Sequence, residues 1–377
     1  MSSSSPQSFT FVYKHVQGID LSMDFYLPPV SAFNASSAED IHIPALVYFH
    51  GGALTVGNRQ SWFPAWLQRR ITAAACAFVT VDYRLMPPAT GHDILADVQD
   101  VFRFLSVDIN PQLRLRYNEH PFILVDSASI AVAGSSSGGL CAYLAAMHAS
   151  PKPNAVLSMY GMGGNFLTSQ YFTPKSEVFF RGRELLDPSQ FSEYLYPSSE
   201  RLSPTADSPL AYHPQTYTIP GYPANSRMLL GRLYLQLGVY LDYYAGIHQP
   251  SLSAVLRETV ADTPHDAREL RRMQFDDVCG VLSPRERVLL PQFGVMRGWP
   301  PCFLVHGEAD SAVLVHESEH MHALLQEAGV DVIMKVIAGE EHSLDYQKDA
   351  DDKYGGPGGL FDEIADFLVR QLKGNMQ

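Results

Sequence analysis

The stretch AVAGSSSGGL (residues 131–140) places three serines in a row between glycines. Only Ser136 fits the pattern G-x-S-x-G, because Gly134 lies two residues before it and Gly138 two residues after it. This pattern is typical of a nucleophile on a sharp turn between a strand and a helix, where a Cβ at either glycine would clash. Serine- and glycine-rich turns are also common without any chemistry, so the rest of the chain has to supply the context.

Short apolar runs alternate with amphipathic stretches on both sides of this segment. The predicted strands are residues 45–49, 76–81, 129–133, 155–160, 302–306 and 332–337, and the predicted helices are residues 94–105, 137–149, 317–329 and 358–372. Continuous apolar strands that alternate with helices indicate a mostly parallel sheet covered on both faces. We also expect an opening hairpin over residues 12–29.

One long interval, residues 165–296, has no clear strand and is rich in Phe, Tyr, Pro and Ser. A structureless loop of this length is implausible inside a compact domain. We therefore predict a mainly helical subdomain inserted into an α/β core that comprises residues 41–164 and 297–377, after an N-terminal segment of residues 1–40.

Composition narrows the possible partners and sites. The net charge of −13 argues against nucleic acid and anionic membranes as partners. The four cysteines have no disulfide-framework or metal-ligand spacing, and the N-terminus carries no secretory signal pattern, so we expect free thiols, no metal site and a cytoplasmic protein. The most apolar segment, residues 226–248, is interrupted by charged residues and predicts a helix with one buried face, not a membrane span.

A serine nucleophile needs a general base, and the base needs an orienting carboxylate. In a parallel sheet these groups come from loops at the carboxyl ends of later strands. Asp310 follows the predicted strand 302–306 and His342 follows the strand 332–337, which produces the order Ser136, Asp310, His342 that is typical of α/β-hydrolases. Glu308 is an alternative acid, and three further histidines on the next predicted helix are expected at the surface: His316, His320 and His322.

Acyl transfer also needs hydrogen-bond donors for the oxyanion of the tetrahedral intermediate. The strand 45–49 runs directly into HGGAL (residues 50–54), here called the oxyanion loop. Glycine lets the main chain approach a ligand closely and turn its amides inward. We predict that Gly51, Gly52, Ala53 and the amide of Ser137 donate to the oxyanion.

These motifs together resemble the hormone-sensitive lipase-like branch of α/β-hydrolases, the fold 3 esterases. HGGA is similar to that family's HGGG, and the other matches are VDYRL at 81–85 with Asp97 in the next helix, AGSSSGG at 133–139, HGEAD at 306–310 and GEEHS at 339–343. The chain departs from the family pattern at Ala53, which replaces the third glycine, at Ser135 and Ser137 beside the nucleophile, and in a longer insertion.

The resemblance implies an α/β-hydrolase fold, a largely helical cap and carboxylester hydrolysis without a cofactor. The cap would comprise the insertion and part of the N-terminal segment up to about Leu27, lying over the serine. Aromatic residues of the insertion are expected to line the substrate pocket, with these candidates: Phe166, Tyr171, Phe172 and Tyr234.

The resulting prediction is a serine esterase acting on a small or medium hydrophobic ester or lactone. Two alternatives remain open on the same scaffold. One is a specialised-metabolism catalyst of the dehydratase, cyclase or lactonase type, in which the histidine acts mainly as a base. The other is a small-molecule receptor that has lost catalysis, a reading disfavoured by the presence of all three triad residues.

Overall fold

The computed structural model describes residues 8–29, 39–116, 121–211, 224–261 and 280–374. Its strands form one eight-stranded sheet in the order β1-β2-β4-β3-β5-β6-β7-β8. β1 pairs antiparallel with β2 and β2 antiparallel with β4, and all other pairs are parallel. The strands are β1 (Ser8–Val16), β2 (Ile19–Tyr26), β3 (Ile41–Phe49), β4 (Ala77–Val81), β5 (Ile123–Ser135), β6 (Val156–Met159), β7 (Cys302–Gly307) and β8 (Val332–Ile337).

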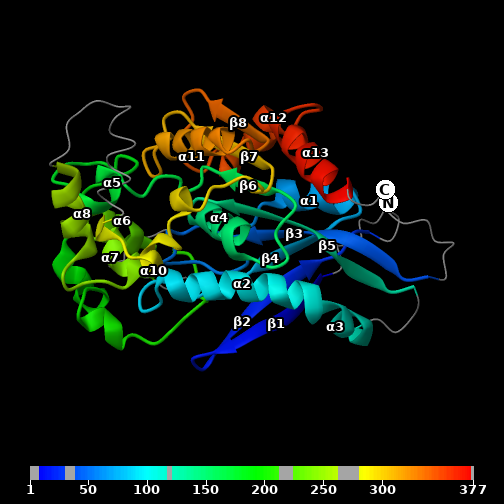
Figure 1. Ribbon diagram of the computed structural model, residues 1–377, viewed down its shortest axis with the longest axis horizontal. Helices are drawn as coiled ribbons and strands as arrows, with labels where there is room; N and C mark the ends of the chain where they lie inside the picture. The colour runs from blue at the N-terminus through cyan, green and yellow to red at the C-terminus, as the bar shows by residue number, and fades with distance from the viewer. Residues whose placement is uncertain (1–7, 30–38, 117–120, 212–223, 262–279, 375–377) are drawn as a thin grey trace.

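Successive side chains of each strand point to opposite faces of the sheet, and the hydrophobic side chains on both faces are buried. On β3, Val47 and Phe49 pack into one hydrophobic cluster, whereas Leu46 and Tyr48 pack into the other. Two helices cover the second face, α1 (Ala65–Ala73) and α13 (Leu360–Lys373). Helices on the first face are α2 (Gly91–Val107), α3 (Ile109–Arg116), α4 (Ser137–His148) and α11 (His316–Glu327) (Figure 1).

Each predicted core strand and helix is present within a few residues of its expected bounds, and the α/β-hydrolase fold class is confirmed. The opening hairpin is also confirmed, but its place differs from the expectation. β1 and β2 extend the main sheet and pack on β4 and α2, so the described residues 8–27 are part of the core and not of the cap. Pairing with β4 buries their apolar side chains, among them Phe11, Met23 and Phe25.

The described part of the insertion between β6 and β7 is helical, with no strand of the main sheet. Its elements gather at one end of the molecule (Figure 1): α5 (Ser169–Phe172), η2 (Pro188–Tyr194), η3 (Ser198–Arg201), α6 (Arg227–Leu237), α7 (Tyr240–Ala245), α8 (Leu252–Ala261), α10 (Pro284–Arg287) and η4 (Pro291–Phe293). Aromatic rings form much of its interior. Phe166 packs on Tyr171 with ring centroids 4.8 Å apart, and Tyr234 stacks on Tyr243 at 3.9 Å.

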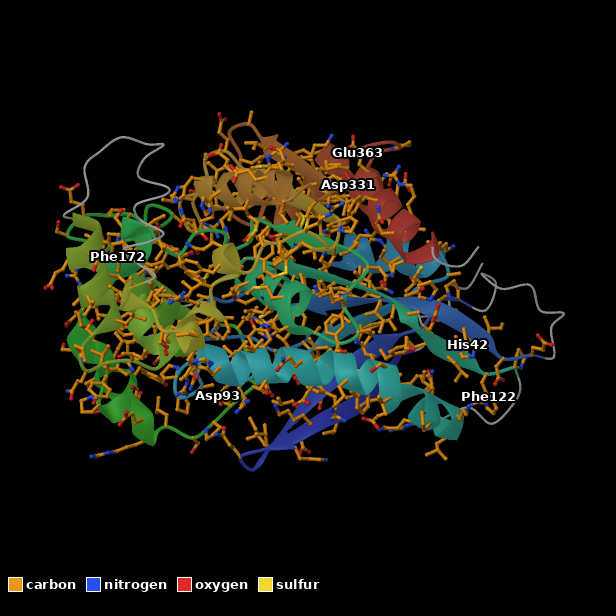
Figure 2. All side chains as sticks on the ribbon, viewed as in Figure 1. His42, Asp93, Phe122, Phe172, Asp331 and Glu363 are labelled. Atoms are coloured by element: carbon orange, nitrogen blue, oxygen red, sulfur yellow. The ribbon has the colours of Figure 1, made fainter. Side chains whose placement is uncertain are left out.

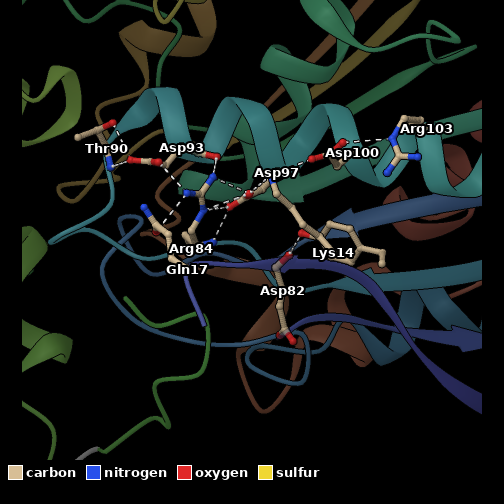
Figure 3. A network of polar contacts seen from close by, with 10 residues as sticks. Lys14, Gln17, Asp82, Arg84, Thr90, Asp93, Asp97, Asp100 and Arg103 are labelled. Atoms are coloured by element: carbon tan, nitrogen blue, oxygen red, sulfur yellow. Dashed lines mark hydrogen bonds and ion pairs between the residues drawn. The ribbon is translucent and has the colours of Figure 1, made fainter. Parts of the chain in front are cut away.

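A buried ion-pair network joins the hairpin, the DYRL segment and α2 (Figure 3). The Arg84 guanidinium donates to Asp97 at 2.8 and 2.9 Å and to Asp93 at 2.7 Å, and Lys14 reaches Asp97 at 2.7 Å. Asp93 also accepts from the Thr90 amide at 2.9 Å, which caps the first turn of α2. Because the Asp97 side chain is fully buried, removing one partner would leave an uncompensated charge in the core.

Three of the predicted free cysteines, Cys76, Cys141 and Cys302, are buried thiols, and Cys279 lies outside the described residues. Among the helices that the structure describes, none has the length and apolar character needed to cross a membrane. Within the same residues, no group of three or more His, Cys, Asp or Glu side chains is arranged to hold a metal ion.

Candidate active site

Ser136 lies on a sharp turn between β5, which ends at Ser135, and α4, which begins at Ser137. Its backbone has φ 55° and ψ −123°, a conformation that non-glycine residues rarely adopt. A Cβ built at Gly134 would stand 2.0 Å from the carbonyl oxygen of Gly138, and one at Gly138 would stand 2.1 Å from that of Phe49. Both glycines of the G-x-S-x-G pattern are therefore required by the convergence of strand and helix.

The hydroxyls of the two neighbouring serines make hydrogen bonds to other groups of the protein. Ser135 Oγ hydrogen bonds the Tyr48 hydroxyl at 2.7 Å, and Ser137 Oγ accepts from the Leu54 amide at 3.1 Å. Both serines are buried, whereas Ser136 is half-exposed and lines a cavity. Ser135 also lines this cavity, but Ser136 is the one of the three serines whose side chain is not buried.

His342 lies between Ser136 and Asp310 in one hydrogen-bonded chain. Its Nε2 is 3.1 Å from Ser136 Oγ, and its Nδ1 is 2.6 Å from an oxygen of Asp310. A carboxylate only accepts hydrogen bonds, so the neutral imidazole carries its proton on Nδ1 and offers Nε2 as an acceptor to the serine hydroxyl. This arrangement can take a proton from the serine as its oxygen attacks an acyl carbon.

The environment of Asp310 keeps it ionised. Burial by itself disfavours the charged carboxylate, but the nearby His342 and His306 imidazoles outweigh burial, and the pKa of Asp310 lies well below its ordinary value. Its other oxygen accepts from the amides of Ala312 and Val313, each at 2.9 Å. These bonds fix the carboxylate at the carboxyl end of β7, facing His342.

The alternative residues weighed from the sequence lie elsewhere. Glu308 is exposed and accepts from the Gly339 amide at 3.0 Å. His320 Nδ1 is 2.7 Å from the Gly164 carbonyl oxygen, and His316, His320 and His322 are partly exposed on α11. The imidazole within hydrogen-bond distance of Ser136 is that of His342.

The oxyanion loop passes directly beside the serine. A Cβ at Gly51 would stand 3.2 Å from Ser136 Cβ and 3.1 Å from the Ser135 carbonyl oxygen. Within the described residues, the amides of Gly51, Gly52, Ala53 and Ser137 donate to no acceptor. They are thus available to a ligand oxygen, as the sequence pattern predicts, and their catalytic use remains a prediction.

Ala53 is accommodated by a glycine of the insertion. Its backbone is left-handed, with φ 54°, and its methyl group faces Gly231 on α6, where an added Cβ would lie only 2.3 Å from Ala53 Cβ. The Tyr240 hydroxyl donates to the Ala53 carbonyl oxygen at 3.0 Å. The insertion therefore holds the third position of the loop by both shape and hydrogen bonding.

Further groups brace the loop from the core side. The Tyr83 hydroxyl donates to the His50 carbonyl oxygen at 2.8 Å, and the Met86 amide donates to the Leu54 carbonyl oxygen at 2.7 Å. Burial lowers the pKa of His50 to about 4, so this imidazole is neutral at pH 7 and stacks on Tyr83. From the side of the insertion, the buried Arg227 of α6 donates to the Met86 and Pro87 carbonyl oxygens at 3.2 and 2.6 Å.

Ser136 and His342 open into a cavity of about 480 Å³ that is lined by both the core and the insertion. Of the four aromatic candidates, Tyr171 lines it. The expectation is wrong for Phe166, Phe172 and Tyr234, whose rings are buried in the interior of the insertion; Figure 2 marks Phe172 there. The aromatic residues that do line the cavity are Trp62, Tyr160, Tyr171, Phe180, Tyr240 and Tyr346.

Sequence reasoning missed several of these residues for different reasons. Tyr160 stacks edge-on against His342, with centroids 4.7 Å apart, and directly follows β6, so its place after a strand was the available signal. Tyr240 lies in the apolar stretch that was interpreted only as a helix with one buried face. No pattern marks Phe180, Arg183 or Arg232 as cavity residues, because Phe180 and Arg183 pair with each other in a short turn outside the helices and Arg232 lies on α6, and tertiary packing places all three at the cavity.

Comparisons with known proteins agree with the α/β-hydrolase fold. A family model for the α/β-hydrolase fold matches residues 46–221, and one for the prolyl oligopeptidase family matches residues 284–374. Probable carboxylesterase M8 from Phoma sp. is 33% identical over 120 residues, which cover 31% of this chain and 37% of that protein. Probable carboxylesterase 13 from Arabidopsis thaliana is 29% identical over 186 residues, which cover 47% of this chain and 54% of that protein.

A different kind of relative matches nearly the whole chain. Non-reducing polyketide synthase Preu6 from Preussia isomera is 24% identical over 379 residues, which cover 97% of this chain and 15% of the synthase. The chain therefore spans less than two thirds of the length of each of these relatives.

Solved structures share the fold at low sequence identity. An alpha/beta hydrolase superfamily protein from Enterococcus faecalis has a TM-score of 0.56 and 14% identity, over 97% of this chain and 100% of that chain. An esterase from Pyrobaculum calidifontis has a TM-score of 0.53 and 17% identity, over 96% of this chain and 84% of that chain. With the matching family model and the two carboxylesterase relatives, the chain is shown to have the α/β-hydrolase fold and to be similar in sequence to carboxylesterases.

Proposed function

We propose that this protein is a serine carboxylesterase that cleaves an ester or lactone through an acyl-enzyme. The observation that carries the proposal is the hydrogen-bonded chain from Ser136 through His342 to Asp310, with distances of 3.1 and 2.6 Å, beside an oxyanion loop with unpartnered amides. A serine hydroxyl becomes a useful nucleophile only when a positioned base accepts its proton.

In this mechanism Ser136 Oγ attacks the ester carbonyl carbon while its proton moves to His342 Nε2. The carbonyl oxygen becomes an oxyanion and accepts hydrogen bonds from among the amides of Gly51, Gly52, Ala53 and Ser137. The tetrahedral intermediate collapses, the carbon–oxygen bond to the alcohol breaks, and His342 passes its proton to the leaving oxygen. Water, deprotonated by His342, then attacks the acyl-enzyme and releases the acid. Asp310 remains ionised and stabilises the imidazolium in both halves.

We further propose that residues 165–296 act as a cap over the serine. Tyr171, Phe180 and Tyr240 come from this interval and line the cavity that also contains Ser136, which supports the proposal. Shielding the ester from bulk water strengthens the hydrogen bonds to the oxyanion.

A second candidate function is suggested by the match to polyketide synthase Preu6 over 97% of this chain. On this reading the protein works in specialised metabolism, as a dehydratase, cyclase or lactonase on a polyketide-type molecule. For a dehydratase or cyclase, His342 would act as a base and Ser136 would not form a covalent bond. The dehydratase and cyclase reactions therefore differ from ester or lactone hydrolysis in that Ser136 is not acylated.

The test is labelling by a fluorophosphonate with mass-spectrometric mapping, combined with turnover of 4-nitrophenyl esters of increasing acyl length. We expect the label on Ser136 and loss of turnover in Ser136→Ala. Ser135→Ala is the matched control, because it removes the same hydroxyl one residue away, and it should retain most activity. An inactive Ser135→Ala that folds normally, beside an active Ser136→Ala, would overturn the assignment. A labelled wild type with no turnover on any ester would favour the second function.

A further inference from the structure

The cavity beside Ser136 contains positive charge without a matching negative charge. Arg181, Arg183 and Arg232 all line it, and none of its described lining residues is an aspartate or glutamate. This is unexpected for a chain with 40 acidic and 27 basic residues. Arg181 has a neighbour of opposite charge, Glu341, at 3.8 Å.

Arg183 and Arg232 differ from Arg181 in lacking a partner. Arg183 is exposed and Arg232 is half-buried, and neither guanidinium makes an ion pair or a hydrogen bond with any residue that the structure describes. The Nε of Arg232 is fully buried and has no acceptor. An unpaired buried donor of this kind is costly, because it has lost its water without gaining a replacement.

The position of Arg232 on α6 places its side chain on the helical face that lines the cavity. Met228, Arg232 and Leu235 follow each other at spacings of four and three on α6, so they share one helical face, and all three line the cavity. Arg232 is thus a charged residue within an otherwise apolar helical face that lines the cavity. Burial and the nearby Arg183 charge lower the pKa of the Arg232 guanidinium, which agrees with two cations close together.

We propose that Arg183 and Arg232 bind a carboxylate of the substrate, so that the preferred ester carries a negative charge away from the bond that is cleaved. This inference rests on the proposed function, whose serine lines the same cavity. Guanidinium groups match carboxylates in geometry and make charge-assisted hydrogen bonds to them. The cavity volume of about 480 Å³ and its aromatic and aliphatic walls fit an acyl chain or ring between the ester and the carboxylate.

The first test compares two 4-nitrophenyl esters with the same eight-carbon acyl chain, the octanoate and the mono-ester of suberic acid, which ends in a carboxylate. The variants are Arg183→Gln, Arg232→Gln and both together. Arg297→Gln is the control, since it removes an exposed arginine that precedes β7 at its amino end, the opposite edge from Ser136.

We expect the ratio of kcat/KM for suberate over octanoate to fall about tenfold or more in the double variant, mainly through KM. The ratio in Arg297→Gln should stay within about twofold of wild type. An unchanged ratio in the double variant, or an equal loss on both esters, would overturn the proposal.

A second test does not require catalysis. Suberanilic acid and octananilide are amide counterparts of the same acyl chains, and Trp62 in the cavity wall allows their binding to be followed by tryptophan fluorescence. We expect tighter binding of suberanilic acid in wild type and loss of that preference in the double variant. If wild type cleaves neither ester but binds in this way, the esterase proposal fails and the carboxylate site stands. Equal binding of the two amides would refute the site alone.

Discussion

Gly231 on α6 and Ala53 in the oxyanion loop form a contact that can be tested by a double-mutant cycle. Gly231→Ala would bring two methyl carbons to 2.3 Å, whereas carbon atoms in contact are normally about 3.5–4.0 Å apart. Either α6 or the loop must therefore move by more than an ångström. In an Ala53→Gly background the nearest atom to the new methyl would be the Cα of residue 53, at 3.8 Å, and the clash disappears.

The magnitudes follow from these distances. Overpacking of this kind costs about 1–3 kcal/mol. The same substitution gains about 1 kcal/mol of helix propensity, so Gly231→Ala alone should be neutral to destabilising by about 2 kcal/mol. Ala53→Gly removes the cost of a left-handed alanine, about 1 kcal/mol. The cycle should therefore show a coupling free energy of about 1–3 kcal/mol, with the double variant at least as stable as wild type.

The assay is urea unfolding of all four proteins, together with hydrolysis of 4-nitrophenyl butyrate. A displacement of the loop by about 1 Å should reduce kcat about a hundredfold in Gly231→Ala, and Ala53→Gly should restore most of it. Gly356→Ala is the control, because a Cβ there would meet nothing within 4 Å. Coupling below about 0.5 kcal/mol, which is ordinary additivity, would refute the argument.

Two further predictions concern titratable groups. His342→Ala should lower kcat on 4-nitrophenyl butyrate at least about a thousandfold and Asp310→Asn somewhat less, because the three groups act as a unit; retained activity in both variants would exclude His342 as the base. Burial raises the pKa of Glu317, which accepts hydrogen bonds from Tyr171 and the Gly163 amide, from an ordinary value of 4.5 to about 7. The folded chain then holds a proton that the unfolded chain releases, so stability falls as pH rises from about 4.5 to 7. Urea unfolding of Glu317→Gln at pH 5 and pH 8 should show the variant gaining up to about 3 kcal/mol relative to wild type at the higher pH; a difference that does not change with pH would contradict this.

The amino-acid sequence by itself determined the core of this protein and the three residues of its hydrogen-bonded chain. Continuous apolar runs that alternate with helical patterns indicate parallel strands buried on both faces, and parallel strands place their carboxyl ends at one edge of the sheet. Asp310 and His342 therefore had to lie near Ser136. Local sterics identify Ser136 among the three serines, because there is no room for a Cβ at positions 134 and 138 and only Ser136 has glycine at both.

Only the tertiary structure decided what surrounds that chain. The sequence left open whether the hairpin of β1 and β2 packs against the insertion. In the structure β2 pairs with β4, which makes the hairpin part of the sheet. In the insertion, aromatic residues occur both in the short helices and in the segments between them, and tertiary packing decides which of them line the cavity. Phe166 and Tyr234 thus fill the interior, whereas Phe180 and Tyr240 line the cavity with Arg232. Such choices depend on contacts between residues far apart in the chain, which a local pattern does not encode.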